Sequence, residues 1–194
     1  MARRSSSDDP RSLRLRALIK GSALALVRAR PACEITLNDL LADSGVSRQG
    51  FYEHFSDRDD ALFHAITDDF ADTLHSERVS SLSINDLLLV LTRFIDQRRD
   101  IYLNLRRSSV FDDVLDQWRS LLLPEIRRLV CTAGPRDSDD IEETSIFILG
   151  GIVDLSRDWL RTADPATPAR QAEIIWRQLT RLLSVLPAHA PGVG

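Results

Sequence analysis

The sequence predicts an all-α fold of nine helices, divided between a small N-terminal head and a larger C-terminal body. Apolar residues recur at intervals of three and four along most of the chain, as they do on the buried face of a helix. No run alternates between apolar and polar residues for more than a few positions, so we expect no strand. With 194 residues and 43% hydrophobic content, the chain can bury a sizeable core.

The first helix is expected to begin at Asp9-Pro10, because proline is tolerated in the first turn of a helix. It should reach about Arg28, before Pro31 breaks the pattern. Its inward face is expected to contain Leu15, Leu18, Ile19, Ser22 and Leu26. Residues 1–11 are polar and charged, and we expect them to form a disordered basic arm.

The next segment predicts a helix-turn-helix. Thr36 is placed as the N-cap of a short helix that Gly45 ends, since glycine adopts the left-handed conformation without a steric cost. Ser47 caps a second short helix, in which Phe51 and Phe55 are the expected buried anchors. Two short helices joined by a tight turn with glycine are typical of DNA-binding proteins that place the second helix in the major groove.

The later helices are bounded by prolines, by a glycine-containing turn and by polar segments. Their expected ranges are 57–74, 85–99, 100–107, 112–131 with a kink site at Pro124, 138–161, and a ninth helix after Asp164-Pro165 that ends before Pro187.

The charge is distributed unevenly. The net charge is −4, which alone argues against a nucleic-acid partner. However, residues 1–58 hold ten Lys and Arg against seven Asp and Glu, a net +3, whereas the remainder holds fifteen against twenty-two, a net −7. A basic head on an acidic body suits a DNA reader with a separate regulatory domain.

Several classes of protein are not expected. No apolar run reaches the roughly 18 residues of a membrane span, and the N-terminus does not resemble a signal peptide, so we expect a cytoplasmic protein without membrane partners. Cys33 and Cys131 lack the spacing of metal or redox sites, although a redox role for Cys33 stays open. The sequence shows no glycine-rich phosphate loop, nucleophile elbow or H-E-x-x-H, so we expect no enzyme, cofactor or metal.

Residues 35–62 closely resemble the DNA-binding domain of the TetR family of transcriptional regulators. The resemblance rests on Thr36, the turn ADSGVS at 42–47, the signature YEHF at 52–55, and Asp57-Arg58 opening the next helix. It covers roughly residues 12–70, and the remainder matches in length, helicity and general pattern. The domains expected are an arm at 1–11, a helix-turn-helix domain at 12–56, a connecting helix at 57–75, a ligand-binding and dimerisation domain at 76–188, and a flexible tail at 189–194.

The resemblance implies a set of DNA contacts. Family members commonly clamp the DNA backbone at the positions of Thr36, Ser47, Tyr52, His54 and Arg58. From their chemistry, Arg48 suits guanine and Gln49 suits adenine. Gly50 would let the helix approach the groove closely, at a cost of about 1 kcal/mol relative to alanine. His54 could instead be structural, and Arg3 and Arg4 could either enter the minor groove or stay solvated.

The resemblance also implies a homodimer on a palindromic operator. Residues 146–153 are apolar around nearly the whole helix circumference, so this helix should be buried on more than one side. One stripe would serve the core of the single chain, and the other a four-helix dimer interface. The interface is assigned to Leu149, Ile152, Val153, Ser156, Trp159, Leu160, Ile175, Leu179, Leu182 and Leu186.

The body is larger than DNA binding requires, so we expect it to receive a small, largely apolar effector that releases a repressor from DNA. The expected lining, mostly apolar with a few polar anchors, is Phe94, Arg98, Tyr102, Phe111, Leu115, Trp118, Leu122, Phe147 and Gly151. Aromatic residues at helical spacing are, however, more often part of an ordinary core than of a ligand site. The alternative function is a DNA-binding regulator without a small-molecule ligand, either constitutive or controlled by a protein partner.

Overall fold

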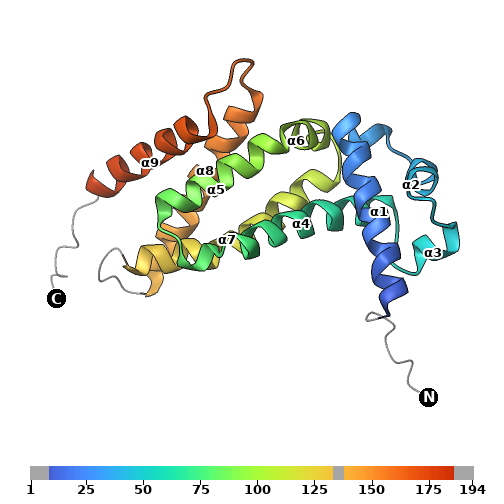
Figure 1. The fold of residues 1–194 in the computed structure, drawn as a ribbon. Coiled ribbons are helices and arrows are strands. Elements are labelled where there is room, and N and C mark those ends of the chain that lie inside the picture. The colour runs from blue at the N-terminus through green and yellow to red at the C-terminus, as the bar shows by residue number, and fades with distance from the viewer. Residues whose placement is uncertain (1–8, 133–137, 186–194) are drawn as a thin grey trace. The chain divides into compact units, whose positions relative to one another are not determined.

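The computed structural model describes residues 9–132 and 138–185, which are helical and contain no strand. The elements are α1 Pro10–Ala29, η2 Ala32–Glu34, α2 Leu37–Ser44, α3 Arg48–Tyr52, α4 Arg58–Ser76, η3 Val79–Ser81, α5 Ile84–Gln97, α6 Arg99–Leu105, α7 Val110–Thr132, α8 Ser138–Arg161 and α9 Pro168–Val185 (Figure 1). The prediction of an all-α fold with nine α-helices is therefore confirmed. The two short 3-10 helices, η2 and η3, were not predicted.

The described residues form two compact units. The first comprises residues 9–75 and 98–120, and the second comprises residues 76–97, 121–132 and 138–185. The boundary between them falls inside α7. The sequence did not indicate that α6 and the first half of α7 belong with the N-terminal helices. The expected domain limits stay predictions, and the predicted tail at 189–194 and residues 1–8 of the arm lie outside the described residues.

The first unit is organised around α1, which packs against α2, α3 and α6 (Figure 1). Its buried face consists of Ile19, Ala23 and Val27 at intervals of four, together with Ser22. Leu18, which the sequence placed on this face, is 47% exposed, so that assignment is wrong. The physical reason is that the buried face runs through Ile19, Ala23 and Val27, and a reading of large apolar residues alone overlooks the alanine.

In the second unit, α5 and α8 both pack against α9. The apolar face of α5 is built from leucines and Phe94, and α7 contributes Leu122, Ile126 and Val130 at intervals of four. Trp159 in α8 donates from Nε1 to the carbonyl oxygen of Ala166 at 2.8 Å, which fixes the connection to α9. None of the helices in the described part of the chain is both long and apolar enough to cross a bilayer.

Candidate nucleic-acid interface

The first helix of the predicted motif, α2, is closed at both ends by local hydrogen bonds. At its N-terminus a capping box forms: the Asp39 N–H donates to Thr36 Oγ1 at 3.2 Å, and the Thr36 N–H donates to Asp39 Oδ2 at 2.7 Å. Hydrogen bonds from the Thr36 backbone and side chain, and then from Arg30, lower the pKa of Asp39 to about 2. At its C-terminus Gly45 has φ +67°, as the left-handed cap requires.

The second helix, α3, is short and is fixed to the core by the packing of aromatic side chains. Ser47 caps it by accepting a hydrogen bond from the Gly50 N–H at 3.1 Å. Phe51 is fully buried and contacts Phe55 with 5.8 Å between ring centroids. Tyr52 packs edge-on against Phe51 but remains 52% exposed. The buried rings therefore fix the helix, while Arg48, Gln49 and Tyr52 present their side chains to solvent.

Gly50 has a packing reason in this structure. A Cβ atom at this position would lie 3.2 Å from Val46 Cγ1 and 3.3 Å from Ser47 Oγ, tighter than ordinary van der Waals contact. The glycine thus lets α3 sit close to the turn before it. The sequence-based hypothesis of a close approach to DNA stays a prediction beside this structural role.

Of the five residues expected to contact the DNA backbone, Thr36 and Arg58 are already hydrogen-bonded within the protein, and His54 is partly buried. Thr36 is occupied by the capping box. Arg58 donates from Nη1 to the carbonyl oxygens of Ala32 at 3.0 Å and Ile35 at 2.7 Å, and from Nε to Asp59 at 2.7 Å. His54 is half-buried, and its Nε2 atom is enclosed without a hydrogen-bond partner in the described residues. A phosphate at Arg58 would therefore compete with existing hydrogen bonds, and DNA contact at all three residues stays a prediction.

Two features beside α3 involve residues that the sequence reading did not single out: a hollow lined in part by Arg11 and Ser12, and a hydrogen bond to Asn38. A surface hollow of about 740 Å³ is lined by Arg11 and Ser12 from the start of α1 and by Gln49 and His54, among others. Asn38, in α2, accepts a hydrogen bond at Oδ1 from Arg48 Nη2 at 2.7 Å. A contact between helices cannot be found from helical spacing alone, which explains why both were missed.

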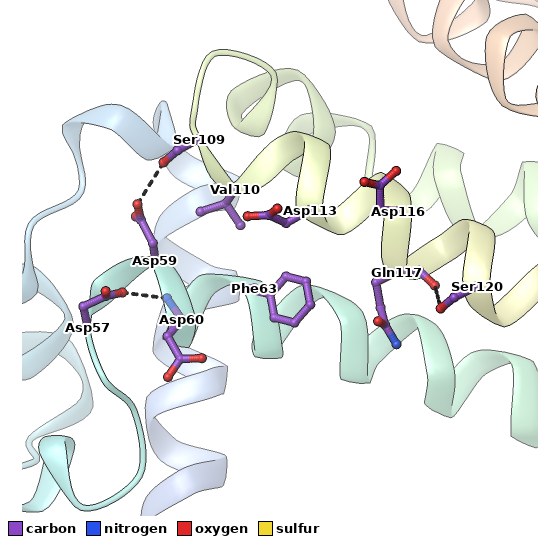
Figure 2. Close-up of a pocket in the computed structure, with 10 residues that line it drawn as sticks. All are labelled: Asp57, Asp59, Asp60, Phe63, Ser109, Val110, Asp113, Asp116, Gln117 and Ser120. Atoms are coloured by element: carbon purple, nitrogen blue, oxygen red, sulfur yellow. Dashed lines mark hydrogen bonds between the residues drawn. The ribbon is translucent and has the colours of Figure 1, made fainter.

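The first unit also carries an acidic cleft of about 560 Å³ between α4 and α7 (Figure 2). The carboxylates are Asp57, Asp59, Asp60, Asp113 and Asp116. Phe63 forms part of its lining between them (Figure 2). Ser109 Oγ donates to Asp59 Oδ2 at 2.9 Å, which links the start of α7 to the start of α4. A surface this acidic repels phosphates, so it marks where a DNA-binding face would end. No group of His, Cys, Asp and Glu among the described residues is suited to hold a metal ion.

The expected ligand residues of the first unit form an aromatic cluster. Trp118 stacks on Phe70 with 4.4 Å between centroids and meets Tyr102 edge-on at 4.8 Å. Burial raises the pKa of Tyr102 well above its ordinary value. Arg98 pairs with both carboxylate oxygens of Asp69, with 2.8 Å between Nη2 and Oδ1, and this hydrogen bonding raises the pKa of Arg98. Leu115 is buried and Phe111 is half-buried.

The remaining candidates for ligand contact belong to the second unit. Phe94 and Leu122 are buried there. Phe147, however, is 65% exposed, and Gly151 is also exposed. A ligand chamber formed by the whole set stays a prediction.

The residues assigned to a dimer interface lie mainly within the second unit's own core. Seven are buried in the single chain: Leu149, Ile152, Val153, Ser156, Trp159, Ile175 and Leu179. Leu160 is half-buried, the Leu182 side chain is not described, and Leu186 lies outside the described residues. The exposed large apolar side chains of α8 are instead Ile146, at 55%, and Phe147. The assignment of the ten residues to a dimer interface stays a prediction.

Comparison with known proteins identifies the fold. No protein-family model matches the sequence, and a search of curated proteins finds no match either. Among solved structures, a TetR transcriptional regulator from Streptococcus agalactiae is similar, with a TM-score of 0.68, 18% identity, and coverage of 88% of this chain and 96% of the other.

Two further structures agree. The fatty acid degradation regulator FadR from Bacillus halodurans gives a TM-score of 0.64 with 12% identity, over 97% of this chain and 100% of that one. A TetR-family transcriptional regulator from Streptomyces coelicolor gives 0.59 with 17% identity, over 94% and 96%. The chain is thus an all-α helix-turn-helix protein. Its fold is that of the TetR-family transcriptional regulators.

Proposed function

We propose that this chain is a DNA-binding transcriptional regulator. The observation that carries the proposal is the presentation of α3. Caps at Thr36 and Ser47, the left-handed Gly45 and the buried Phe51 together fix a short helix whose polar side chains face solvent. A rigid exposed helix after a tight turn has the shape that enters a major groove. The resemblance of residues 35–62 to TetR-family DNA-binding domains and the shared fold support the same function.

In this proposal the exposed side chains of α3 make two kinds of contact with DNA, to bases and to phosphates. Arg48 can offer paired N–H donors to guanine, and Gln49 can offer a donor and an acceptor to adenine. Tyr52 stands at the end of α3, where its hydroxyl can reach a phosphate. Ser47 is exposed and occupies a position at which TetR-family members commonly contact a phosphate. Phosphate contacts fix position, and the two base contacts supply sequence preference.

We further propose that the protein acts as a homodimer through α8. Ile146 and Phe147 are the exposed apolar side chains of this helix, and Gly150 and Gly151 follow them with open space around each Cβ position. A partner helix can therefore approach this surface closely, and burying two large side chains on each chain favours association. A dimer of this kind would place two heads on successive major grooves, about 34–36 Å apart.

Regulation by a small, largely apolar effector is the third part of the proposal, with repression as its expected direction. The effector would bind near the aromatic cluster of Tyr102 and Trp118 and shift the population of conformers. Within the first unit, α4 is tied to α6 through Asp69 and Arg98, and to the segment before α2 through Arg58. Movement of α4 would therefore reach the DNA-binding helices. Coupling of about 1–3 kcal/mol changes DNA affinity roughly 5–150-fold.

The alternative is a DNA-binding regulator that answers to no small molecule. Thermal unfolding with a panel of fatty acids and acyl thioesters distinguishes the two, because a ligand that binds the folded state raises the melting temperature. One solved structure of this fold is a fatty acid degradation regulator, which makes acyl compounds a reasonable first panel. A concentration-dependent shift supports regulation by ligand, and a flat response across the panel favours the alternative.

DNA binding itself is tested with variants of α3. Arg48→Ala and Tyr52→Ala should each weaken binding to a selected DNA site roughly 5- to 150-fold, because each removes about 1–3 kcal/mol of contact energy. Arg119→Ala is the matched control, since Arg119 is an exposed residue of α7 that pairs with Asp116 of the acidic cleft. Equal affinity of all three variants and the parent would contradict the proposed role of α3.

A further inference from the structure

We propose that Asn38 is a positioning residue for base recognition, which holds the Arg48 guanidinium in the orientation that reads a base pair. This inference rests on the proposed function, in which Arg48 enters the major groove. It adds a residue from the first helix of the motif to the determinants of sequence preference. The juxtaposition that carries it is the hydrogen bond from Arg48 Nη2 to Asn38 Oδ1 at 2.7 Å.

Both residues lie in the first turn of their helices. Arg48 is the first residue of α3, directly after its cap Ser47, and Asn38 is the second residue of α2, after its cap Thr36. Both side chains are exposed, so the hydrogen bond lies on the surface of the motif and is not part of its core. A surface bond that joins the first turns of both helices is well placed to act on a bound partner.

The chemistry of the pair fixes which way the amide faces. A guanidinium carries donors alone, so the amide oxygen of Asn38 must point to it and the amide nitrogen must point away. Arginine has five N–H donors, and the bond to Asn38 uses one of them. Enough donors remain for a bidentate contact with the O6 and N7 atoms of guanine. Positioning by Asn38 is therefore compatible with base recognition.

Local hydrogen bonds fix the backbone at Asn38, so that its side chain can position Arg48. Asn38 lies between Thr36 and Asp39, the two residues of the capping box, in the first turn of α2. Arg30 pairs with Asp39 at 2.9 Å between Nη2 and Oδ2. A long arginine side chain loses rotamer freedom when it binds, and a side chain already held near its bound geometry loses less. Asn38 should therefore strengthen the contact that Arg48 makes with its preferred base.

Gln49 provides an internal comparison. Its Nε2 atom lies 3.5 Å from Glu53 Oε1, at the outer limit of a hydrogen bond, and the two residues are one turn apart in sequence. Gln49 is thus held more weakly than Arg48, and its partner Glu53 belongs to the same segment of chain, not to another helix. We expect sequence discrimination to be sharper at the base pair that Arg48 reads than at the one that Gln49 reads.

The test measures affinities for a selected site and for all its single-base variants, using the parent, Arg48→Ala, Asn38→Ala and the double variant. Arg48→Ala identifies the base pair that Arg48 reads. At that position Asn38→Ala should reduce discrimination about three- to tenfold, as expected for the net contribution of one solvent-exposed hydrogen bond, and leave other positions unchanged. In the Arg48→Ala background, the Asn38 substitution should have no further effect on discrimination.

Two more variants separate positioning from other roles. Asn38→Asp keeps the acceptor oxygen, so it should keep discrimination while lowering affinity for every sequence through its added negative charge. Asp43→Ala, the control on an exposed position of α2, should leave the ratio between sequences unchanged. Loss of affinity by Asn38→Ala to the same extent for all sequences would identify a phosphate contact and overturn the inference, as would no effect at all. A parent protein without any sequence preference would contradict the proposed function itself, and this inference with it.

Discussion

Arg58 donates from its Nη1 atom to the carbonyl oxygen of Ile35 at 2.7 Å, across 23 positions of sequence. The same guanidinium bonds Ala32 and Asp59, and Asp59 accepts a hydrogen bond from Ser109. One arginine at the start of α4 thus joins the segment before α2 to the start of α7. This linkage gives Arg58 a structural role in setting the position of the helix-turn-helix formed by α2 and α3.

We expect Arg58→Ala to lower the free energy of unfolding by about 1–3 kcal/mol, because it leaves carbonyl oxygens without their donor. Arg58→Lys should recover little of this loss, since an ammonium lacks the fork of donors that reaches Asp59 and both carbonyls. Urea denaturation measures the effect. Arg119→Ala, which removes an exposed pair with Asp116, is the control and should change stability by less than about 0.5 kcal/mol. Equal stabilities of the two alanine variants would show that the linkage contributes little.

Two glycines should respond oppositely to alanine. Gly45 has φ +67°, where a Cβ atom costs about 1–2 kcal/mol, so Gly45→Ala should destabilise the fold by that amount. Gly21 lies inside α1 with open space at its Cβ position, so Gly21→Ala should stabilise by about 0.5–1 kcal/mol through helix propensity. Thermal unfolding of both variants checks the pair. Destabilisation by both substitutions would mean that the surroundings of Gly21 are less open than described.

The capping box predicts that the stability of the fold depends on pH in the acidic range. The pKa of Asp39 is about 2 in the folded state against an ordinary value of 3.8. A carboxyl with a lowered folded-state pKa stabilises the fold above its unfolded pKa, and this contribution disappears as the pH falls from about 4 to about 2. Asp39→Asn should therefore lose less stability over this range than the parent. The measurement is denaturant unfolding at several pH values, with Asp43→Asn as the control; identical pH profiles for the parent and Asp39→Asn would exclude this contribution.

The exposed apolar surface of α8 predicts the effect of charge on assembly. Phe147→Glu and Ile146→Glu should convert the proposed dimer to monomers, because each places a carboxylate where a partner would exclude water. Light scattering at several concentrations measures the mass. The comparison is Leu149→Ala, which empties a buried site and should cost about 2–5 kcal/mol of stability. Glutamate variants that keep the mass of the parent would place the interface elsewhere.

The parts of the fold that depend on local chemistry could be predicted from the sequence. The caps at Thr36 and Ser47, the stop at Gly45 and the range of α8 follow from neighbouring residues, and the structure agrees with each. The side of a helix that faces the core depends on partners distant in sequence, which explains the error at Leu18. The same limit applies to α8, which has two apolar stripes. Sequence alone cannot tell which of the two packs in the core of the single chain.

The same distinction between local features and contacts distant in sequence applies to the candidate nucleic-acid interface. Arg48, Gln49 and Tyr52 were predicted from their places in α3, and the structure exposes all three. The bonds of Arg58 to Ala32 and Ile35 and the contact of Asn38 with Arg48 join residues 10 to 26 positions apart in sequence. Such contacts depend on how helices meet, and no periodicity or motif in one segment predicts them.

The most direct test of the central claim is capture of genomic DNA fragments by the purified full-length protein, followed by sequencing and a salt titration on the best site. The proposed function predicts one palindromic motif, with half-sites about 10 base pairs apart or a multiple of that spacing. Its affinity should exceed that of unrelated DNA by at least about a thousandfold. Enrichment spread over unrelated sequences, with a steep salt dependence and no shared motif, would contradict sequence-specific regulation.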